Sequence, residues 1–161
     1  MKEKDLYPGI RDWLYKILKS KYKNKKSAAY DTSEKNLNKF IQEKGWISLS
    51  PEYAEYEIKV DILGVVFDKD KIDFLLIEVK NTKISLKDIS QLIGYTRVVK
   101  PINSMILSPN WVSDPVKKLF EVYKRFDVLK YEKIKIIKVC KWDQEKKDID
   151  YRFIYPSLPL F

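Results

Sequence analysis

Two charged residues end an apolar run near the middle of the chain. Residues 74–77 (Phe-Leu-Leu-Ile) are typical of a buried strand, and Glu78 and Lys80 follow them with Val79 in between. Residues two apart in a strand point to the same side, so this carboxylate and this ammonium project together. Burying such charges is costly unless they are paired or bind something. The pattern indicates either a solvated strand end or a site for a charged ligand.

A third charged residue is expected on the strand before this one. Residues 56–67 and 72–80 predict two strands joined by the polar turn 68–71, which is the pattern of an antiparallel hairpin. If the hairpin is symmetric about the middle of that turn, paired residue numbers sum to 139. Asp61 then lies opposite Glu78.

The facing carboxylates predict a metal site. Directly opposed side chains have Cβ atoms about 5 Å apart, and two carboxylates that close repel each other unless a proton or a cation lies between them. We expect Asp61 and Glu78 to bind a divalent metal, with the backbone carbonyl of Val79 as a third ligand. Lys80 would stand beside that cation, close to an anionic substrate. The alternative is that these side chains are solvated or paired across the strands.

The composition limits the chemistry that such a site can perform. The chain has no histidine and one cysteine, Cys140, which we expect to be buried on a strand. Catalytic triads that need histidine and cysteine-rich metal sites are therefore excluded. A metal must be held by carboxylates, carbonyls and water, which are hard ligands that favour Mg²⁺, Mn²⁺ or Ca²⁺.

The order of the charged residues resembles the motif of the PD-(D/E)XK nuclease superfamily, whose fold is called restriction-endonuclease-like. Asp61 is followed by Glu78-Val79-Lys80 on the next strand of the hairpin, and Val60 stands where the name of the motif has proline. The resemblance implies a nuclease that hydrolyses phosphodiester bonds with water, without a covalent intermediate.

Two flanking helices extend the resemblance. Gln91 and Tyr95 on the expected helix after the hairpin resemble the Gln-X-X-X-Tyr motif of RecB-like nucleases. Glu34 and the helix that ends at Gly45 resemble the Glu-bearing first helix of Mrr-like members. The match covers residues 31–108, which we treat as the motif-bearing core.

The resemblance implies a role for each matched residue. Asp61 and Glu78 would hold Mg²⁺, for which Mn²⁺ could substitute, and Lys80 would orient or deprotonate the attacking water and balance developing charge on the phosphate. Gln91 would position the lysine or a water, and Tyr95 would contact a phosphate. An exposed helix glutamine and a packing aromatic residue are the plainer accounts of these last two.

A further carboxylate is expected from the N-terminal part of the chain. By the resemblance Glu34 would join the site, although an acid in the first turn of a helix is also favoured by the helix dipole. Glu3 competes for the same role, and Glu57 lies on the same side of its strand as Asp61.

The charge of the chain predicts an anionic partner. The formal net charge is +9, and residues 16–26 hold six lysines without an acid. We expect nucleic acid, and by the resemblance DNA, although lysine-rich segments also serve as solvated helix faces. The residues expected to contact it, besides Tyr95, are Lys19, Lys21, Lys23, Lys25 and Lys26.

The remaining pattern predicts one α/β domain over residues 1–161, with a central mixed β-sheet flanked by helices. A strand, a helix and a further strand predict a crossover into a partly parallel sheet. The expected helices are 5–22, 33–44, 85–99 and 114–126, and the expected strands besides the hairpin are 46–50, 103–108, 133–140 and 150–155.

No hydrophobic stretch reaches membrane-spanning length, so we expect a cytoplasmic protein without a membrane partner. The function expected from the residues and the resemblance is that of a metal-dependent deoxyribonuclease. The alternatives are a nucleic-acid-binding module that keeps the fold without catalysis, and an interaction subunit whose lysines only keep it soluble. By the resemblance, cutting both strands with one active site per chain often requires a homodimer.

Overall fold

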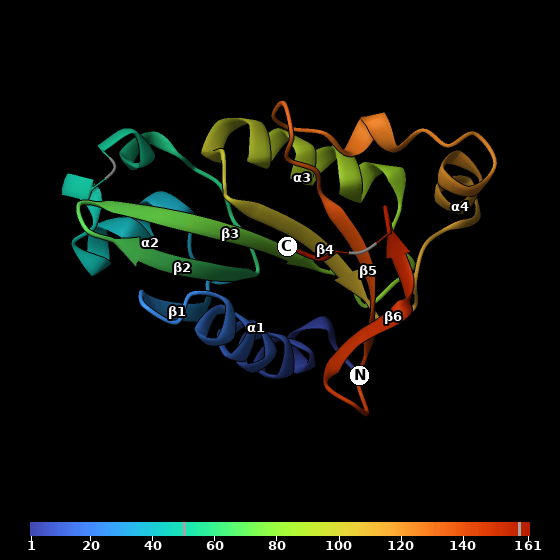
Figure 1. Ribbon diagram of the computed structural model, residues 1–161, viewed down its shortest axis with the longest axis horizontal. Helices are drawn as coiled ribbons and strands as arrows, with labels where there is room; N and C mark the ends of the chain where they lie inside the picture. Colours follow the sequence, from blue (N-terminus) through green and yellow to red (C-terminus); the bar gives the residue numbers. More distant parts are fainter. Residues whose placement is uncertain (50, 158) are drawn as a thin grey trace.

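A single mixed β-sheet organises the residues that the computed structural model describes, which are 1–49, 51–157 and 159–161. Figure 1 shows its six strands, which neighbour one another in chain order. The β3–β4 and β4–β5 pairs are parallel, and the other three pairs are antiparallel. The strands are β1 (Lys26–Asp31), β2 (Ile62–Asp68), β3 (Lys71–Val79), β4 (Asn103–Ser108), β5 (Lys138–Asp143) and β6 (Asp148–Tyr155).

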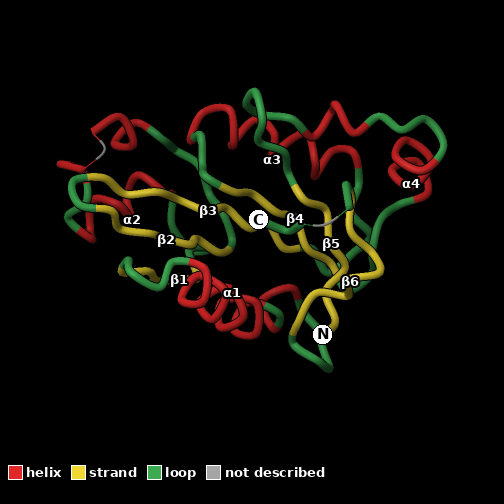
Figure 2. Tube along the Cα trace, in the orientation of Figure 1, coloured by secondary structure: helices red, strands yellow, loops and turns green. Residues whose placement is uncertain are grey.

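Helices cover both faces of this sheet, as Figure 2 shows in red against the yellow strands. One apolar layer lies between the sheet and α1, and the other between the sheet and α2, α3 and α4. The expected α/β domain with a central mixed sheet is therefore confirmed at this level. The helices are α1 (Tyr7–Lys21), α2 (Leu37–Lys44), α3 (Leu86–Val99) and α4 (Asp114–Glu121). In the described part of the chain, no helix is long and apolar enough to cross a bilayer.

The hairpin of β2 and β3 has the predicted register. Its pairs run from Ile62 with Ile77 to Asp68 with Lys71, and the numbers of each pair sum to 139. Lys69 takes a positive φ of 51° in the turn, which lets the chain reverse within two residues. This register places the residue that precedes β2 beside the last residues of β3.

Crossover helices make the centre of the sheet parallel, as expected. α3 connects β3 to β4, and its start is capped by Ser85, which accepts a hydrogen bond from the backbone of Asp88. α4 lies between β4 and β5 in the chain. Because β3 and β4 run in the same direction, their carboxyl ends meet at one edge of the sheet. Cys140 is buried on β5, as predicted.

Helix α1 packs close beneath β2 because one residue there has no side chain. A Cβ added to Gly64 would lie 3.1 Å from both Leu14 and Leu75. Leu14 and Leu18 of α1 are fully buried in this layer. The close packing fixes the axis of α1 against the hairpin and directs its first turn toward the start of β2.

Five expectations about secondary structure are wrong in whole or in part. The strand expected over 56–67 begins only at Ile62, and the helix expected over 33–44 begins only at Leu37. Residues 46–50 do not form a strand: Ile47–Leu49 is a 3₁₀ turn, and residue 50 lies outside the described residues. Trp46 there packs edge-on against Phe40 and Phe67, which keeps this segment folded over the sheet. The helix expected over 114–126 ends at Glu121, and the strand expected over 133–140 begins only at Lys138.

Strand β1 was not expected, because it begins at Lys26, the last residue of the lysine-rich segment, and its sequence has no clear strand pattern. It pairs antiparallel with β2 at the edge of the sheet. Ala28 and Ala29 in its middle are weak strand formers, so only the neighbouring strand makes this segment extended. The lysines at its start are typical of an edge strand, where charge discourages pairing with other chains.

Candidate active site

The structure brings three of the predicted residues together where the hairpin ends. Glu78 is the second-last residue of β3 and is 7% exposed, while Asp61 directly precedes β2. The Lys80 ammonium donates to Glu78 Oε1 at 2.9 Å. The backbone N–H of Val79 donates to Asp61 Oδ2 at 2.8 Å, which locks Asp61 against the end of β3. These residues form what we call the carboxylate cluster: Asp61, Glu78 and Lys80.

Burial and nearby negative charge disfavour the charged forms of both acids. Burial raises the pKa of Glu78 to about 7, the charge of Asp61 adds to the rise, and Lys80 opposes it. Burial also raises the pKa of Asp61, against the hydrogen bonds that it accepts from Val79 and Tyr7. A cation between these groups would relieve the repulsion, so the site is electrostatically prepared for one.

Lys80 keeps its proton in this arrangement. Burial lowers its pKa, but the charge and hydrogen bond of Glu78, together with Glu3 and Asp61, outweigh burial and leave the pKa above its ordinary value. Lys80 is therefore an ammonium group that can stabilise negative charge. It is not a neutral amine that could accept a proton.

The start of α1 adds two residues to the cluster. Tyr7 is 4% exposed, and its hydroxyl lies 2.9 Å from Asp61 Oδ1 and 3.3 Å from Glu3 Oε1. Glu3 also accepts from the backbone N–H of Asn81, just beyond β3, at 3.3 Å. Burial, and then the charge of Asp61, raise the pKa of Tyr7, so it stays a neutral donor.

Glu3 is the N-terminal acid that reaches the cluster. Its charge raises the pKa of both Asp61 and Glu78. Glu34 instead forms a surface ion pair with Lys4 and leaves 72% of its side chain exposed, and Glu57 is exposed as well. Glu34 lies in the turn between β1 and α2, which begins only at Leu37, whereas Glu3 lies directly before α1, the helix packed against the hairpin.

Tyr7 was missed because its signal in the sequence is ordinary. It lies at the start of an amphipathic helix, where a tyrosine is expected to pack, and nothing local indicates that its hydroxyl reaches a residue fifty-four positions later. The spacing of four residues between Glu3 and Tyr7 was the available hint, since such residues are neighbours on a helical segment.

Gln91 and Tyr95 contact each other. Gln91 Nε2 donates to the Tyr95 hydroxyl at 2.8 Å across one turn of α3. Gln91 is exposed, and Tyr95 packs partly buried against the core. Among the described residues, no hydrogen bond links this pair to Glu78 or Lys80.

The predicted nucleic-acid lysines gather at the other end of the hairpin. Lys25 donates to Asp68 Oδ2 at 2.9 Å, at the end of β2 that is opposite to Asp61. A strand of this length separates the two ends by roughly 20 Å. Lys23 is exposed. The other three lysines each lie over an aromatic ring: Lys19 over Tyr15, Lys21 over Phe161 and Lys26 over Phe67.

The donor set at the cluster fits a hard cation. Across residues 1–49, 51–157 and 159–161, no three His, Cys, Asp or Glu side chains are already arranged around one metal position. Two carboxylate ligands suffice for Mg²⁺, however, because this ion usually keeps several waters and takes further oxygens from substrate phosphates. Asp61 and Glu78 would be those ligands, and Glu3 would add a further negative charge close to them.

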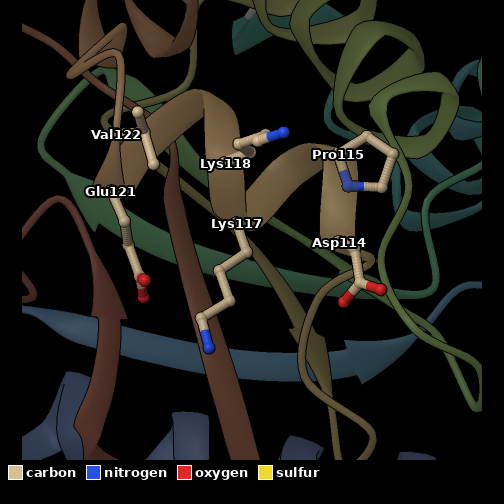
Figure 3. Close-up of a pocket in the computed structure, with 6 residues that line it drawn as sticks. All are labelled: Asp114, Pro115, Lys117, Lys118, Glu121 and Val122. Carbon is tan, nitrogen blue, oxygen red and sulfur yellow. The ribbon is translucent and has the colours of Figure 1, made fainter.

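A separate cavity of about 510 Å³ lies along α4 (Figure 3). Its lining alternates in charge, because Asp114 and Glu121 stand beside Lys117 and Lys118 on the same short helix. None of these residues belongs to the carboxylate cluster. The mixed charge does not select an anionic ligand.

Comparisons of this chain with protein-family models, with curated proteins and with solved structures found no match. The resemblance to PD-(D/E)XK nucleases therefore remains a prediction made from the residues.

Proposed function

We propose that this protein is a metal-dependent nuclease with a restriction-endonuclease-like fold that hydrolyses phosphodiester bonds in DNA. The observation that carries the proposal is the convergence of Asp61, Glu78 and Lys80 at the end of two paired strands. Glu78 is buried and Asp61 is partly buried, burial raises the pKa of both, and the charge of Asp61 raises that of Glu78 further, which is a costly arrangement for a purely structural site.

The proposed chemistry divides among these side chains. Asp61 and Glu78 hold a divalent cation, which lowers the pKa of a bound water and stabilises charge on the phosphate. The Lys80 ammonium, now held by Glu78 at 2.9 Å, turns its charge toward the phosphate oxygens as negative charge develops. Tyr7 and the backbone of Val79 fix the two oxygens of Asp61, so that carboxylate needs little reorganisation.

A cleavage assay with a matched pair of variants tests the proposal. Linear, circular, branched and single-stranded DNA are incubated with the protein and Mg²⁺ or Mn²⁺, with EDTA as the metal-free arm. Glu78→Gln keeps the shape of the site and removes one metal ligand charge, so cleavage should fall by at least about 10²-fold. Glu34→Gln makes the same change in an exposed acid outside the cluster and should cleave like the parent.

Two outcomes would contradict the proposal. Cleavage by Glu78→Gln at the parental rate would remove the catalytic assignment. Binding of DNA without cleavage by the parent under every metal condition would favour the inactive binding module. The homodimer that double-strand cutting implies is tested by measuring the mass of the protein in solution with and without duplex DNA.

A further inference from the structure

A groove of about 390 Å³ lies between α1 and the turn that joins β5 to β6. Figure 1 places this turn beside the start of α1, close to the N-terminus. Lysines line the groove from both sides: Lys16 comes from α1, and Lys146 and Lys147 come from the turn. Segments more than a hundred residues apart in sequence thus direct lysines to one concavity.

The acids that line the groove are already engaged by donors. Asp148 Oδ1 accepts from the indole of Trp13 at 2.8 Å and lies 3.2 Å from the Tyr151 hydroxyl. Asp12 is bound by the guanidinium of Arg11, its neighbour on α1, at 2.9 Å. In the part of the chain that the structure describes, both acids are therefore engaged through Oδ1 only, and the three lysines outnumber the two acids, so the lining keeps a net positive charge.

The lysines, in contrast, are largely free to bind. Lys146 lies 3.7 Å from Asp143, a long contact at an exposed position. Among the described residues, neither Lys16 nor Lys147 forms an ion pair. Three ammonium groups with at most one weak partner are therefore available to an anionic ligand that enters the groove.

A glycine borders the groove where α1 faces the β5–β6 turn. A Cβ added at Gly9 would lie 3.6 Å from the ring of Trp142 and 4.0 Å from the stem of Lys147. Trp13, which lines the groove, packs edge-to-face against the buried Trp142 with ring centroids 5.9 Å apart, so its ring is held in place. The lysines thus border a concave surface with an ordered base.

The groove borders the start of α1, the helix that also supplies Tyr7. Pro8 and Gly9, at its edge, directly follow Tyr7, whose hydroxyl contacts Asp61. From Tyr7 the helix rises about 1.5 Å per residue, so Lys16 lies roughly 13 Å further along. Nucleotides of one duplex strand rise about 3.4 Å each, so three or four would span this length.

We propose that this groove binds the phosphodiester backbone of a nucleic-acid strand and leads that strand to the carboxylate cluster. The inference rests on the proposed function, because it identifies the path of that function's substrate. The cavity on α4 is the weaker candidate, since its two lysines are balanced by two acids (Figure 3). That cavity supplies the matched control.

Binding to a short fluorescent DNA duplex, measured by anisotropy in EDTA, tests the groove without cleavage. Each phosphate contact contributes about 0.9 to the slope of log affinity against log salt between about 50 and 200 mM. The double variant Lys146→Gln, Lys147→Gln should lower that slope by about 2 and weaken binding at low salt by at least about tenfold. The double variant Lys117→Gln, Lys118→Gln removes the same charge from α4 and should keep the parental slope. Equal slopes for the two double variants would overturn the proposal.

A variant that changes shape and not charge gives a second test. Gly9→Leu fills the groove over Trp142, so it should weaken duplex binding several-fold, while Gly9→Ala adds one methyl at ordinary contact distance and should bind like the parent. Circular dichroism confirms that both variants fold. Parental affinity of folded Gly9→Leu would mean that the backbone does not enter the groove.

The outcomes separate this inference from the proposed function. If the parent cleaves DNA but both double variants bind it equally, the proposed binding groove is wrong and the proposed nuclease function is retained. If the groove variants lose salt-dependent binding while Glu78→Gln cleaves normally, the groove stands and the catalytic assignment is wrong. If the parent does not bind the duplex at all, the groove proposal is overturned.

Discussion

The two ends of β3 carry the same pair of residue types in different physical states. At its start, Lys71 lies 3.4 Å from Asp73, and the two side chains are 64% and 23% exposed. At its end, Lys80 lies 2.9 Å from Glu78, and these side chains are 20% and 9% exposed. Both pairs have a spacing of two residues, so spacing alone does not distinguish them.

Burial gives the second pair its chemical character. An exposed pair is solvated and screened, and contributes little to stability. The Glu78 carboxylate has lost water and faces Asp61, so its pKa is raised to about 7. An acid in this state gains more from a cation than an exposed acid does, which is why we place the metal at this end of the strand.

Replacing the lysine at each end should separate the two pairs most clearly. Lys80→Met keeps much of the stem and removes the ammonium, so it should reduce metal-dependent cleavage by at least about 10²-fold. DNA affinity should stay within about tenfold, because the basic groove is intact. Lys71→Met should leave both quantities close to those of the parent.

Rates of cleavage and duplex affinities measured on the same preparations check this prediction. Similar rates for Lys80→Met and Lys71→Met would show that the buried pair has no special role. A large loss of affinity in Lys80→Met would instead assign Lys80 to substrate binding.

The sequence predicts the elements whose signals are local. Residues 72–80 and 103–108 were expected as strands and differ by at most one residue from β3 and β4. The short polar turn set the register of the hairpin, and through it the meeting of Asp61 and Glu78. Alternating or continuous apolar residues bounded by a turn determine such features without help from distant segments.

The rest depends on contacts between distant segments. β1 is extended because it pairs with β2, although its own alanines and lysines favour no strand. Glu3 and Tyr7 join the cluster because Gly64 lets α1 approach the hairpin, and no spacing in the sequence encodes that approach. Lys16 lines the same groove as Lys146 and Lys147 because the fold brings α1 beside the β5–β6 turn, which no local pattern in the sequence indicates.

The pH dependence of stability should differ between the acids at the two ends. Glu78 has its pKa raised from 4.5 to about 7 in the folded protein, so the folded state binds a proton more tightly than the unfolded chain. The free energy of unfolding of the metal-free protein should therefore fall as pH rises from about 4.5 to 7. Glu78→Gln has no such group and should lose less stability over this range.

Thermal unfolding in EDTA at several pH values checks this sign. The advantage of Glu78→Gln over the parent should be larger at pH 7 than near pH 5, and Mg²⁺ should stabilise the parent more than the variant. Asp73→Asn, at the other end of β3, should follow the parent. If the stability of the parent and of Glu78→Gln changes in parallel with pH, the pKa of Glu78 is not raised in the folded protein.

The smallest expected effect concerns the hydroxyl of Tyr7, which acts on the reaction only through Asp61. Tyr7→Phe keeps the buried ring and removes one hydrogen bond to a charged acceptor, which should destabilise the protein by about 1–3 kcal/mol. It also removes an interaction that lowers the pKa of Asp61, so the pH profile of cleavage should move to higher pH.

A second tyrosine distinguishes positioning from simple stability. Tyr155→Phe removes a hydroxyl that donates to Glu121 on α4, away from the carboxylate cluster, and Tyr155 is likewise buried. It should also lower stability but leave the pH profile of cleavage unchanged. If Tyr7→Phe behaves in the same way, Tyr7 only stabilises the fold. If the pH profile of cleavage moves for Tyr7→Phe alone, the first turn of α1 controls the pKa of Asp61. The end of β3 then differs from its start because a helix covers it.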